Sequence, residues 1–306
     1  MKTTFDELDA GGASGANRWI SSALWKHLPL EPVTDRWDRR GGVAMVDDFT
    51  DFNGALSTND GQYYSEGNTY YAYQTASTFI VPVALSGTPA SVLPASVGAI
   101  ALYGATGITD NDIMGMLWGG QKAAPYGSFP FAVIPGISGD LAFEARFKVS
   151  SVAASIGDLF IGLAGAAGVQ MLTATSPIAD ADTLVTTHSL LGFSRLAAET
   201  TQLYLTYERA SGTVARTLNM TTLVADTYIK AGFFYNGAQQ TLTPYIDGAA
   251  VAAAYRIGRA TANATPWPND YMAPMICAKQ IDGDTKQTVT LDWWACAQLP
   301  PIKGQS

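Results

Sequence analysis

Alternation of apolar and polar residues is the feature of this chain that most constrains its fold. Residues 141–149, LAFEARFKV, show it most clearly. The apolar positions are Leu141, Phe143, Ala145, Phe147 and Val149, and Glu144, Arg146 and Lys148 lie between them. Successive side chains of a β-strand point to opposite faces, so the pattern predicts a strand with one buried and one polar face.

Three further segments repeat the alternation, at residues 202–208, 228–236 and 288–297. The side chains predicted to face inward are Leu203, Leu205 and Tyr207 in the first segment, Ile229, Ala231, Phe233 and Tyr235 in the second, and Val289, Leu291, Trp293 and Ala295 in the third. Many short strands predict an all-β chain folded as an antiparallel β-sandwich or jelly roll.

Turn residues separate these segments. The stretch LTPYIDGAAV, residues 242–251, has Asp247-Gly248 at its centre, which predicts a hairpin because both residues tolerate positive φ. Ser211-Gly212, Asn236-Gly237 and Asp282-Gly283 predict further turns. Between residues 50 and 140 the pattern is less regular and predicts edge strands broken by Pro and Gly. We expect one domain over residues 43–306, with an insertion around 86–128 as an open alternative.

Residues 1–42 differ from the rest and predict an N-terminal arm. Their first part is rich in Gly, Ala and Ser and predicts no fold of its own. The following NRWISSALWKHL predicts a short amphipathic helix, which could dock on its own body or on a neighbouring molecule. The arm residues expected to contact a partner are Trp19, Trp25, Arg36, Trp37, Arg39 and Arg40, although a solvated loop also explains the basic cluster.

Charge and composition limit the classes of partner that the protein can bind. Charged residues form 14% of the 306 residues, against about 25% in typical soluble domains. A weakly charged surface suits a protein packed against other copies or partners. The net charge of −8 argues against nucleic acid as a partner, because phosphate binding needs clustered Lys and Arg.

No membrane or export segment is expected. The chain shows no Sec-type signal peptide, and its longest apolar run, residues 79–85, is far shorter than the roughly 20 residues that span a bilayer. The sequence therefore predicts a soluble protein made in a cytoplasm. Cys277 and Cys296 match no metal-binding spacing and are expected to be small core hydrophobes.

No catalytic residues are predicted. Glycan hydrolases need two carboxylates flanking the scissile bond, and the closest two of the six Glu residues are nine positions apart. Glu144 is expected to be an ordinary charge on the solvent face of its strand. His27 and His188 are the only histidines, which makes a Ser/His/Asp triad a poor fit. A carboxylate pair assembled from distant strands stays open.

No metal or cofactor is predicted, with calcium as the open alternative. The pairs Asp110/Asp112, Asp180/Asp182 and Asp282/Asp284 supply suitable oxygens, but Asp and Gly are also what turns require.

Aromatic residues give one candidate ligand site. Tyr70, Tyr71 and Trp267 could stack on sugar rings, whereas core or interface packing is the expected alternative.

Several stretches together carry a family resemblance. They are VDDF at 46–49, LAFEARFKV at 141–149, GDLFIGLAG at 157–165, ADTYIKAGFFYN at 225–236, LTPYIDGAAV at 242–251 and VTLDWWACAQ at 289–298. In this order they resemble the concanavalin A-like, laminin G-like jelly rolls. The last three are more narrowly similar to structural proteins of tailed bacteriophages that carry this fold on the virion.

This resemblance implies a virion structural protein on the capsid exterior, assembled in the host cytoplasm. We expect a head decoration or cement protein whose partners are the major capsid protein and its own copies, as a homotrimer. The alternative is a carbohydrate-binding module of a head or tail fibre, and a glycan hydrolase is a third option. The resemblance applies to the fold first, because one fold hosts many functions.

Overall fold

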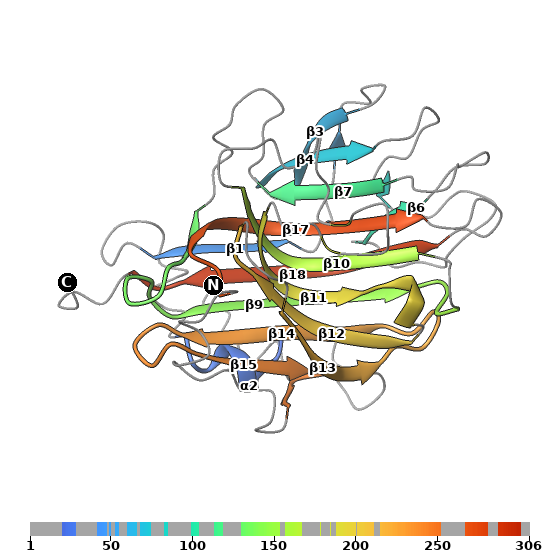
Figure 1. Ribbon diagram of the computed structural model, residues 1–306. Coiled ribbons are helices and arrows are strands. Elements are labelled where there is room, and N and C mark those ends of the chain that lie inside the picture. Colours follow the sequence, from blue (N-terminus) through green and yellow to red (C-terminus); the bar gives the residue numbers. More distant parts are fainter. Residues whose placement is uncertain are drawn as a thin grey trace.

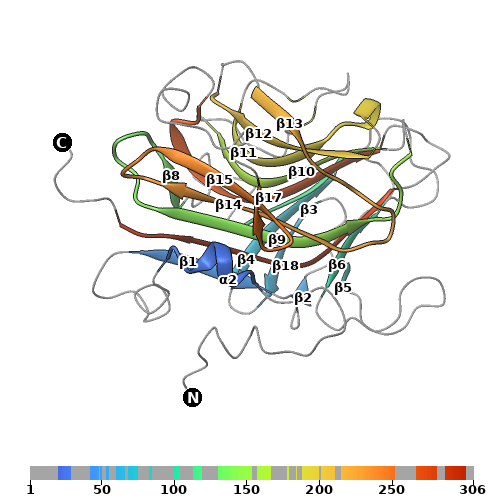
Figure 2. The same ribbon diagram turned by 90° about the horizontal axis from the view of Figure 1, so that it is seen from below.

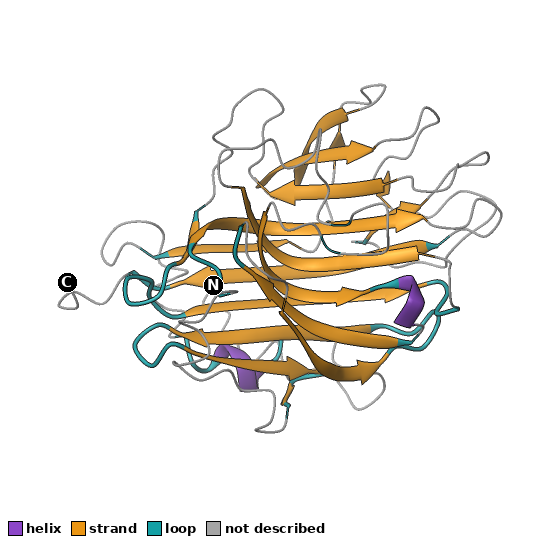
Figure 3. Cartoon of the chain, in the orientation of Figure 1, coloured by secondary structure: helices purple, strands orange, loops and turns teal. Residues whose placement is uncertain are grey.

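The structure is a computed structural model. It describes residues 20–28, 42–47, 49, 53–54, 60–65, 68–74, 83–84, 99–103, 113–118, 130–153, 157–166, 178, 184, 188–199, 201–210, 215–251, 267–280 and 287–300. Two antiparallel sheets face each other as layers (Figures 1 and 2). Strands dominate the described chain, with short helical turns beside them (Figure 3). The predicted all-β fold, an antiparallel β-sandwich, is confirmed.

Within the described residues, one sheet has eight strands and the other has ten. The eight-stranded sheet runs β16 (Ala249–Ala250), β15 (Thr241–Ile246), β14 (Ile229–Asn236), β9 (Leu141–Val149), β18 (Thr288–Gln298), β6 (Ile100–Tyr103) and β5 (Val83–Ala84), and β1 (Val43–Asp47) also pairs with β18. The ten-stranded sheet runs β13 (Ala215–Thr222), β12 (Gln202–Glu208), β11 (His188–Arg195), β10 (Gly157–Ala166), β17 (Asp270–Gln280), β7 (Ile113–Trp118), β4 (Asn68–Gln74), β3 (Asp60–Ser65) and β2 (Asn53–Gly54), with β8 (Phe131–Val133) on β17.

Among the described residues, two short helical elements accompany the sheets. Helix α2 (Ser22–Trp25) lies on the outer side of the sheet that contains β9 and β18 (Figure 2). The 3-10 turn η1 (Ala197–Glu199) follows β11 directly. The predicted short N-terminal helix is therefore confirmed.

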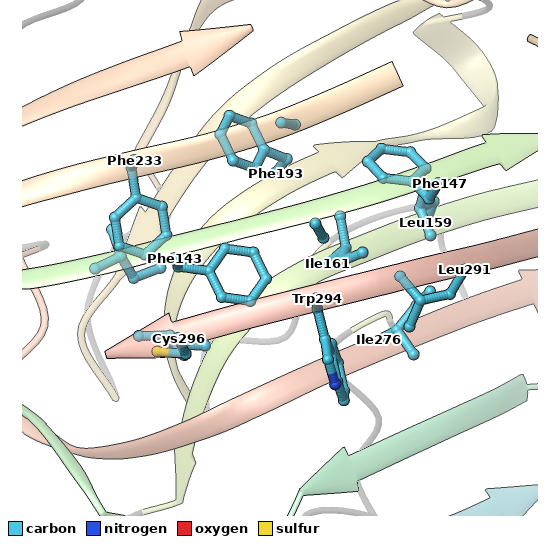
Figure 4. Close-up of a cluster of buried hydrophobic side chains, with 14 of the residues drawn as sticks. Phe143, Phe147, Leu159, Ile161, Phe193, Phe233, Ile276, Leu291, Trp294 and Cys296 are labelled. Carbon is cyan, nitrogen blue, oxygen red and sulfur yellow. The ribbon is translucent and has the colours of Figure 1, made fainter. Parts of the chain in front are cut away.

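The main core fills the space between the two sheets. Phe143 and Phe233 stack with ring centroids 5.6 Å apart, and Phe193 of the opposite sheet meets Phe233 at 6.5 Å (Figure 4). All the apolar positions predicted to face inward on β9, β12 and β14 belong to this buried cluster. Cys296 lies in this cluster and Cys277 in a second apolar cluster, so both are the buried core hydrophobes that were expected.

A β-bulge makes one prediction wrong. Between Leu291 and Trp293, β18 contains one more residue than the facing β9, and the extra residue is Asp292. An extra residue reverses the alternation of side chains beyond it. Trp294 and Cys296 therefore enter the core, whereas Trp293, Ala295 and Ala297 lie on the outer face.

The predicted Asp247-Gly248 hairpin is confirmed between β15 and β16. Asp247 has φ +48° and Gly248 has φ +80°, the left-handed values that suit a two-residue turn. The Asp247 carboxylate also accepts a hydrogen bond of 2.9 Å from the Lys230 amide of β14, which fixes the hairpin against its neighbour. The turns predicted at 211–212 and 282–283 lie outside the described residues.

The region around 86–128 contributes strands to both sheets. β6 pairs with β18 in one sheet, and β7 pairs with β17 in the other. These strands, which lie in the region considered as a possible insertion, pair within the sandwich. No helix in the described ranges is long and apolar enough to cross a bilayer.

Two glycines face each other where β10 and β11 come together. Gly162 is paired with Gly192, and a Cβ on Gly192 would lie 2.6 Å from the Gly162 Cα. Because the obstacle is backbone, we expect Gly192→Ala to destabilise the fold by about 2–3 kcal/mol. The urea midpoint of the variant measures this loss, and an unchanged midpoint would contradict the close approach.

Candidate functional site

The N-terminal segment, residues 20–28, docks on the outer face of the eight-stranded sheet. Leu24, Trp25 and Leu28 are buried there. The apolar part of the sheet surface beneath them, which we call the docking face, consists of Ala142, Phe234, Tyr245, Trp293, Ala295 and Ala297. The chain therefore uses both faces of this sheet, one for the main core and one for the segment.

Glu144 of β9 anchors the segment. Its carboxylate accepts hydrogen bonds from the Ser21 amide at 2.8 Å, the Ser21 hydroxyl and the Trp25 indole Nε1 at 2.8 Å. Burial raises the pKa of Glu144, while the hydrogen bonds from Ser21 and Trp25 and the charge of Lys230 act in the opposite direction. The prediction that Glu144 is an ordinary solvent-face charge is wrong, because the segment covers it completely.

His27 closes the end of the segment over two aromatic rings. Its imidazole stacks on Phe234 with centroids 4.7 Å apart, and its Nε2 lies 3.1 Å from the Tyr245 hydroxyl. Partial burial and the nearby Lys26 lower the pKa of His27, and Asp140 opposes them. A lowered pKa favours the uncharged imidazole, which suits stacking on an apolar surface.

Next to the segment, β9 carries two cations that share one aromatic ring. The Arg146 guanidinium lies 4.0 Å from the centroid of Tyr228, and Lys148 Nζ lies 5.2 Å from it. Arg146 also forms an ion pair with the bulged Asp292, and Lys148 lies 3.9 Å from Asp226. These contacts hold both cations beside the Tyr228 ring.

The ten-stranded sheet has a contrasting outer face along β12. Gln202, Tyr204, Thr206 and Glu208, which we call the polar row, alternate with the core residues of that strand. The Tyr204 hydroxyl donates to the Gln202 side chain, and Thr206 shares a 2.6 Å hydrogen bond with Ser194 of β11. Tyr204 and Gln202 remain partly exposed.

Glu208 ends the polar row and is buried. Among the described residues neither carboxylate oxygen has a hydrogen-bond partner, and Leu190 of the second apolar cluster lies directly across the ladder. Burial raises the pKa of Glu208 to about 8. At neutral pH the group is therefore mostly a neutral carboxylic acid, which can both donate and accept a hydrogen bond.

The structure revises the predicted aromatic ligand site. Trp267 is buried, with its ring 5.6 Å from Tyr207 and 5.5 Å from Tyr235, so it offers no face to a sugar. Its role as a stacking platform is wrong, and the predicted core alternative is correct. Tyr70 and Tyr71 are adjacent in β4, where Tyr70 pairs with Trp118 of β7, and only their backbones are described.

The predicted arm contacts fall into two groups. Trp25 is buried on its own body, so it is not available to a separate partner while the segment is docked. Trp19, Arg36, Trp37, Arg39 and Arg40 lie outside the described residues.

The described residues contain no candidate metal site. In the described parts of the chain, no group of three or more His, Cys, Asp or Glu side chains could hold a metal ion. The aspartate pairs considered for calcium lie outside the described residues.

Sequence reasoning missed the importance of Glu144 and Glu208. Alternation placed both on the outer faces of their strands, and that placement is correct. The burial of Glu144 depends on residues 20–28, which are distant from it in sequence. A signal was present in the arm, because Ser21 and Trp25 are four residues apart and can direct two donors to one acceptor across a helical turn.

Several solved structures resemble this chain in the general arrangement of their strands. No family model and no curated protein matches the chain. The carbohydrate recognition domain of Emp47p is similar with TM-score 0.48 and 7% identity over 85% of this chain and 95% of that one. A protein of unknown function from Shewanella oneidensis MR-1 has TM-score 0.47 and 13% identity over 94% and 97%.

Peanut lectin is also similar, with TM-score 0.46 and 11% identity over 86% of this chain and 99% of that one. Likenesses this distant describe a general arrangement of strands, and we base no functional argument on them. The β-sandwich itself is seen directly in the two antiparallel sheets of this chain.

Proposed function

We propose that this protein is a non-catalytic structural component of a tailed-phage virion, a decoration or cement protein on the exterior of the head. The observation that carries the proposal is that the N-terminal segment, residues 20–28, docks on the outside of the sandwich through hydrogen bonds to Glu144. A rigid body with an arm attached through side chains is suited to linking neighbouring subunits. The phage assignment itself rests on the sequence resemblance of residues 225–236, 242–251 and 289–298.

The protein would stabilise the shell by burying surface between itself and the shell subunits. A body bridging several shell subunits adds apolar contact and hydrogen bonds, which raises the free energy needed to open the shell. The major capsid protein and further copies of this chain, brought together as a trimer on the shell, are the proposed partners. In this scheme Trp25 holds the arm to the body, and the contacts proposed for the shell are Trp19, Arg36, Trp37, Arg39 and Arg40.

Shell binding in vitro tests this function. Purified heads that lack the protein are mixed with the full chain and separated by sedimentation. We expect the chain to sediment with heads and to raise the temperature at which they release DNA. An Arg36→Ala/Arg39→Ala/Arg40→Ala variant should bind at least tenfold more weakly. Failure of the unaltered chain to bind heads would exclude the decoration role.

A carbohydrate-binding role is the second candidate, and a specific observation favours it. The polar row presents the partly exposed ring of Tyr204 beside the Gln202 amide, a combination of stacking surface and hydrogen-bonding group that suits a sugar. Tyr70 and Tyr71 remain further candidates on the same sheet.

Glycan binding by Tyr204 variants tests this candidate. If the polar row binds sugar, Tyr204→Ala should weaken binding to any glycan found on an array at least tenfold. The matched control is Tyr271→Ala, since Tyr271 is 57% exposed and lies on another strand of the same sheet. Equal loss in both variants, or no loss in either, would remove the polar row from consideration. Since no calcium site is proposed, chelator should leave binding unchanged.

A further inference from the structure

The N-terminal segment is bound as a separate helical ligand would be. Among the described residues it joins no β-ladder, and its polar contacts with the body come from Ser21, Trp25 and His27. Its apolar residues lie on the docking face as an amphipathic helix lies on a complementary surface. None of these contacts depends on the segment and the sheet belonging to the same molecule.

The docking face requires an occupant. Without the segment, the sheet would expose Phe234, Trp293 and neighbouring apolar side chains together with the Glu144 carboxylate. An exposed apolar patch of this kind is an association site. Whatever fills it must supply donors to Glu144 and apolar groups beside it.

The fit is specific to this sequence. The Leu24 side chain lies over Gly232, where a Cβ would approach within 2.7 Å of Leu24 Cδ1. Ser21 also fits against Gly248, whose added Cβ would be 3.1 Å from the Ser21 hydroxyl. Gly232 and Gly248 leave room for Leu24 and Ser21, and Glu144 accepts hydrogen bonds from Ser21 and Trp25. This fit identifies the natural occupant of the docking face as residues 20–28 of a copy of this chain.

We propose that the docking face also accepts residues 20–28 of a second copy, so that molecules associate by exchanging their N-terminal segments. The contacts formed between copies are the same as those within one copy, which makes exchange a low-cost route to association. Residues 29–42 connect the segment to β1, and fully extended they reach about 50 Å, far enough for a neighbour. This inference does not depend on the proposed phage function.

The concentration of the protein determines whether the docking face holds its own segment or the segment of a second copy. Within one molecule the tethered segment has an effective concentration of about a millimolar, so single copies in dilute solution keep their own segment. Exchange becomes favourable when copies are held side by side at comparable local concentration.

Complementary variants of the full chain test the proposal. Trp25→Ala weakens the segment but keeps the docking face, whereas Glu144→Ala weakens the face but keeps the segment. Mixed in equal amounts, the two should form a heterodimer in which the intact segment of one copy fills the intact face of the other. Size-exclusion chromatography with light scattering should show twice the monomer mass in the mixture and the monomer mass for each variant alone. A mixture that stays monomeric at hundreds of micromolar would overturn the proposal.

The unaltered chain gives a second readout if either variant fails to fold. Light and heavy isotope-labelled protein are mixed at high concentration and cross-linked between amines and carboxylates. Lys26 is exposed on the segment, and the body residue Asp140 acts on the pKa of the neighbouring His27 as Lys26 does, in the opposite direction. Exchange should give links from Lys26 to the body in mixed light and heavy pairs. Links confined to single-isotope pairs would show that the segment stays on its own molecule.

Discussion

Replacing Glu208 by Gln should make the protein more stable by about 4–5 kcal/mol at pH 8.5 and leave its stability nearly unchanged at pH 4.5. The folded-state pKa of Glu208 is raised from 4.5 to about 8 by burial. Between these values the folded chain binds more protons than the unfolded chain, so stability falls as pH rises through this window. Each pH unit within it removes about 1.4 kcal/mol, and the neutral amide avoids this loss.

Chemical unfolding of the two proteins at several pH values measures this difference. Asp226→Asn is the matched control, because it also replaces a carboxylate by an amide but at a side chain that is 67% exposed. The control should follow the pH profile of the unaltered chain. Parallel profiles for Glu208→Gln and the unaltered chain would show that Glu208 is not a buried neutral acid.

The second large effect is expected at Glu144. Glu144→Ala would leave the Ser21 amide and the Trp25 indole without their acceptor under a buried segment. Each such buried donor costs about 1–3 kcal/mol, so the docking of the segment should weaken by about 3 kcal/mol in total. Faster hydrogen exchange should appear first at the amides of Leu24, Trp25 and Leu28. These amides donate to carbonyls within the segment and close its turns.

Glu144→Gln is the control for that experiment. It keeps one acceptor oxygen and nearly the same shape, so we expect it to retain more than half of the protection at these amides. If Glu144→Ala exchanged no faster than the unaltered chain, apolar packing alone would hold the segment, and Glu144 would not be its anchor.

Strand positions and the core were predictable because they follow from local chemistry. The alternation in residues 141–149 and 202–208 identified both the strands and the side chains that enter the core. Asp247-Gly248 likewise predicted its hairpin, since positive φ is a property of those residues. These features depend on residues adjacent in sequence.

Other features depend on contacts that no local pattern encodes. The bulge at Asp292 reversed the predicted faces of Trp293 and Ala295, because register is set by the partner strand β9. Glu144 was expected to be a surface charge, since alternation identifies the face of a strand but not what covers that face. Trp267 resembled a stacking platform in its Pro-rich stretch, yet its contacts with Tyr207 and Tyr235 place it in the core.

The proposed role as a structural component of a virion is tested most directly by the copy number of this chain in the particle. Purified particles are digested, and peptides of this chain are counted against those of the major capsid protein by quantitative mass spectrometry. The decoration role predicts hundreds of copies per head. A few to a few dozen copies would instead indicate a fibre or tail position and favour glycan binding, and absence from the particle would contradict the structural role.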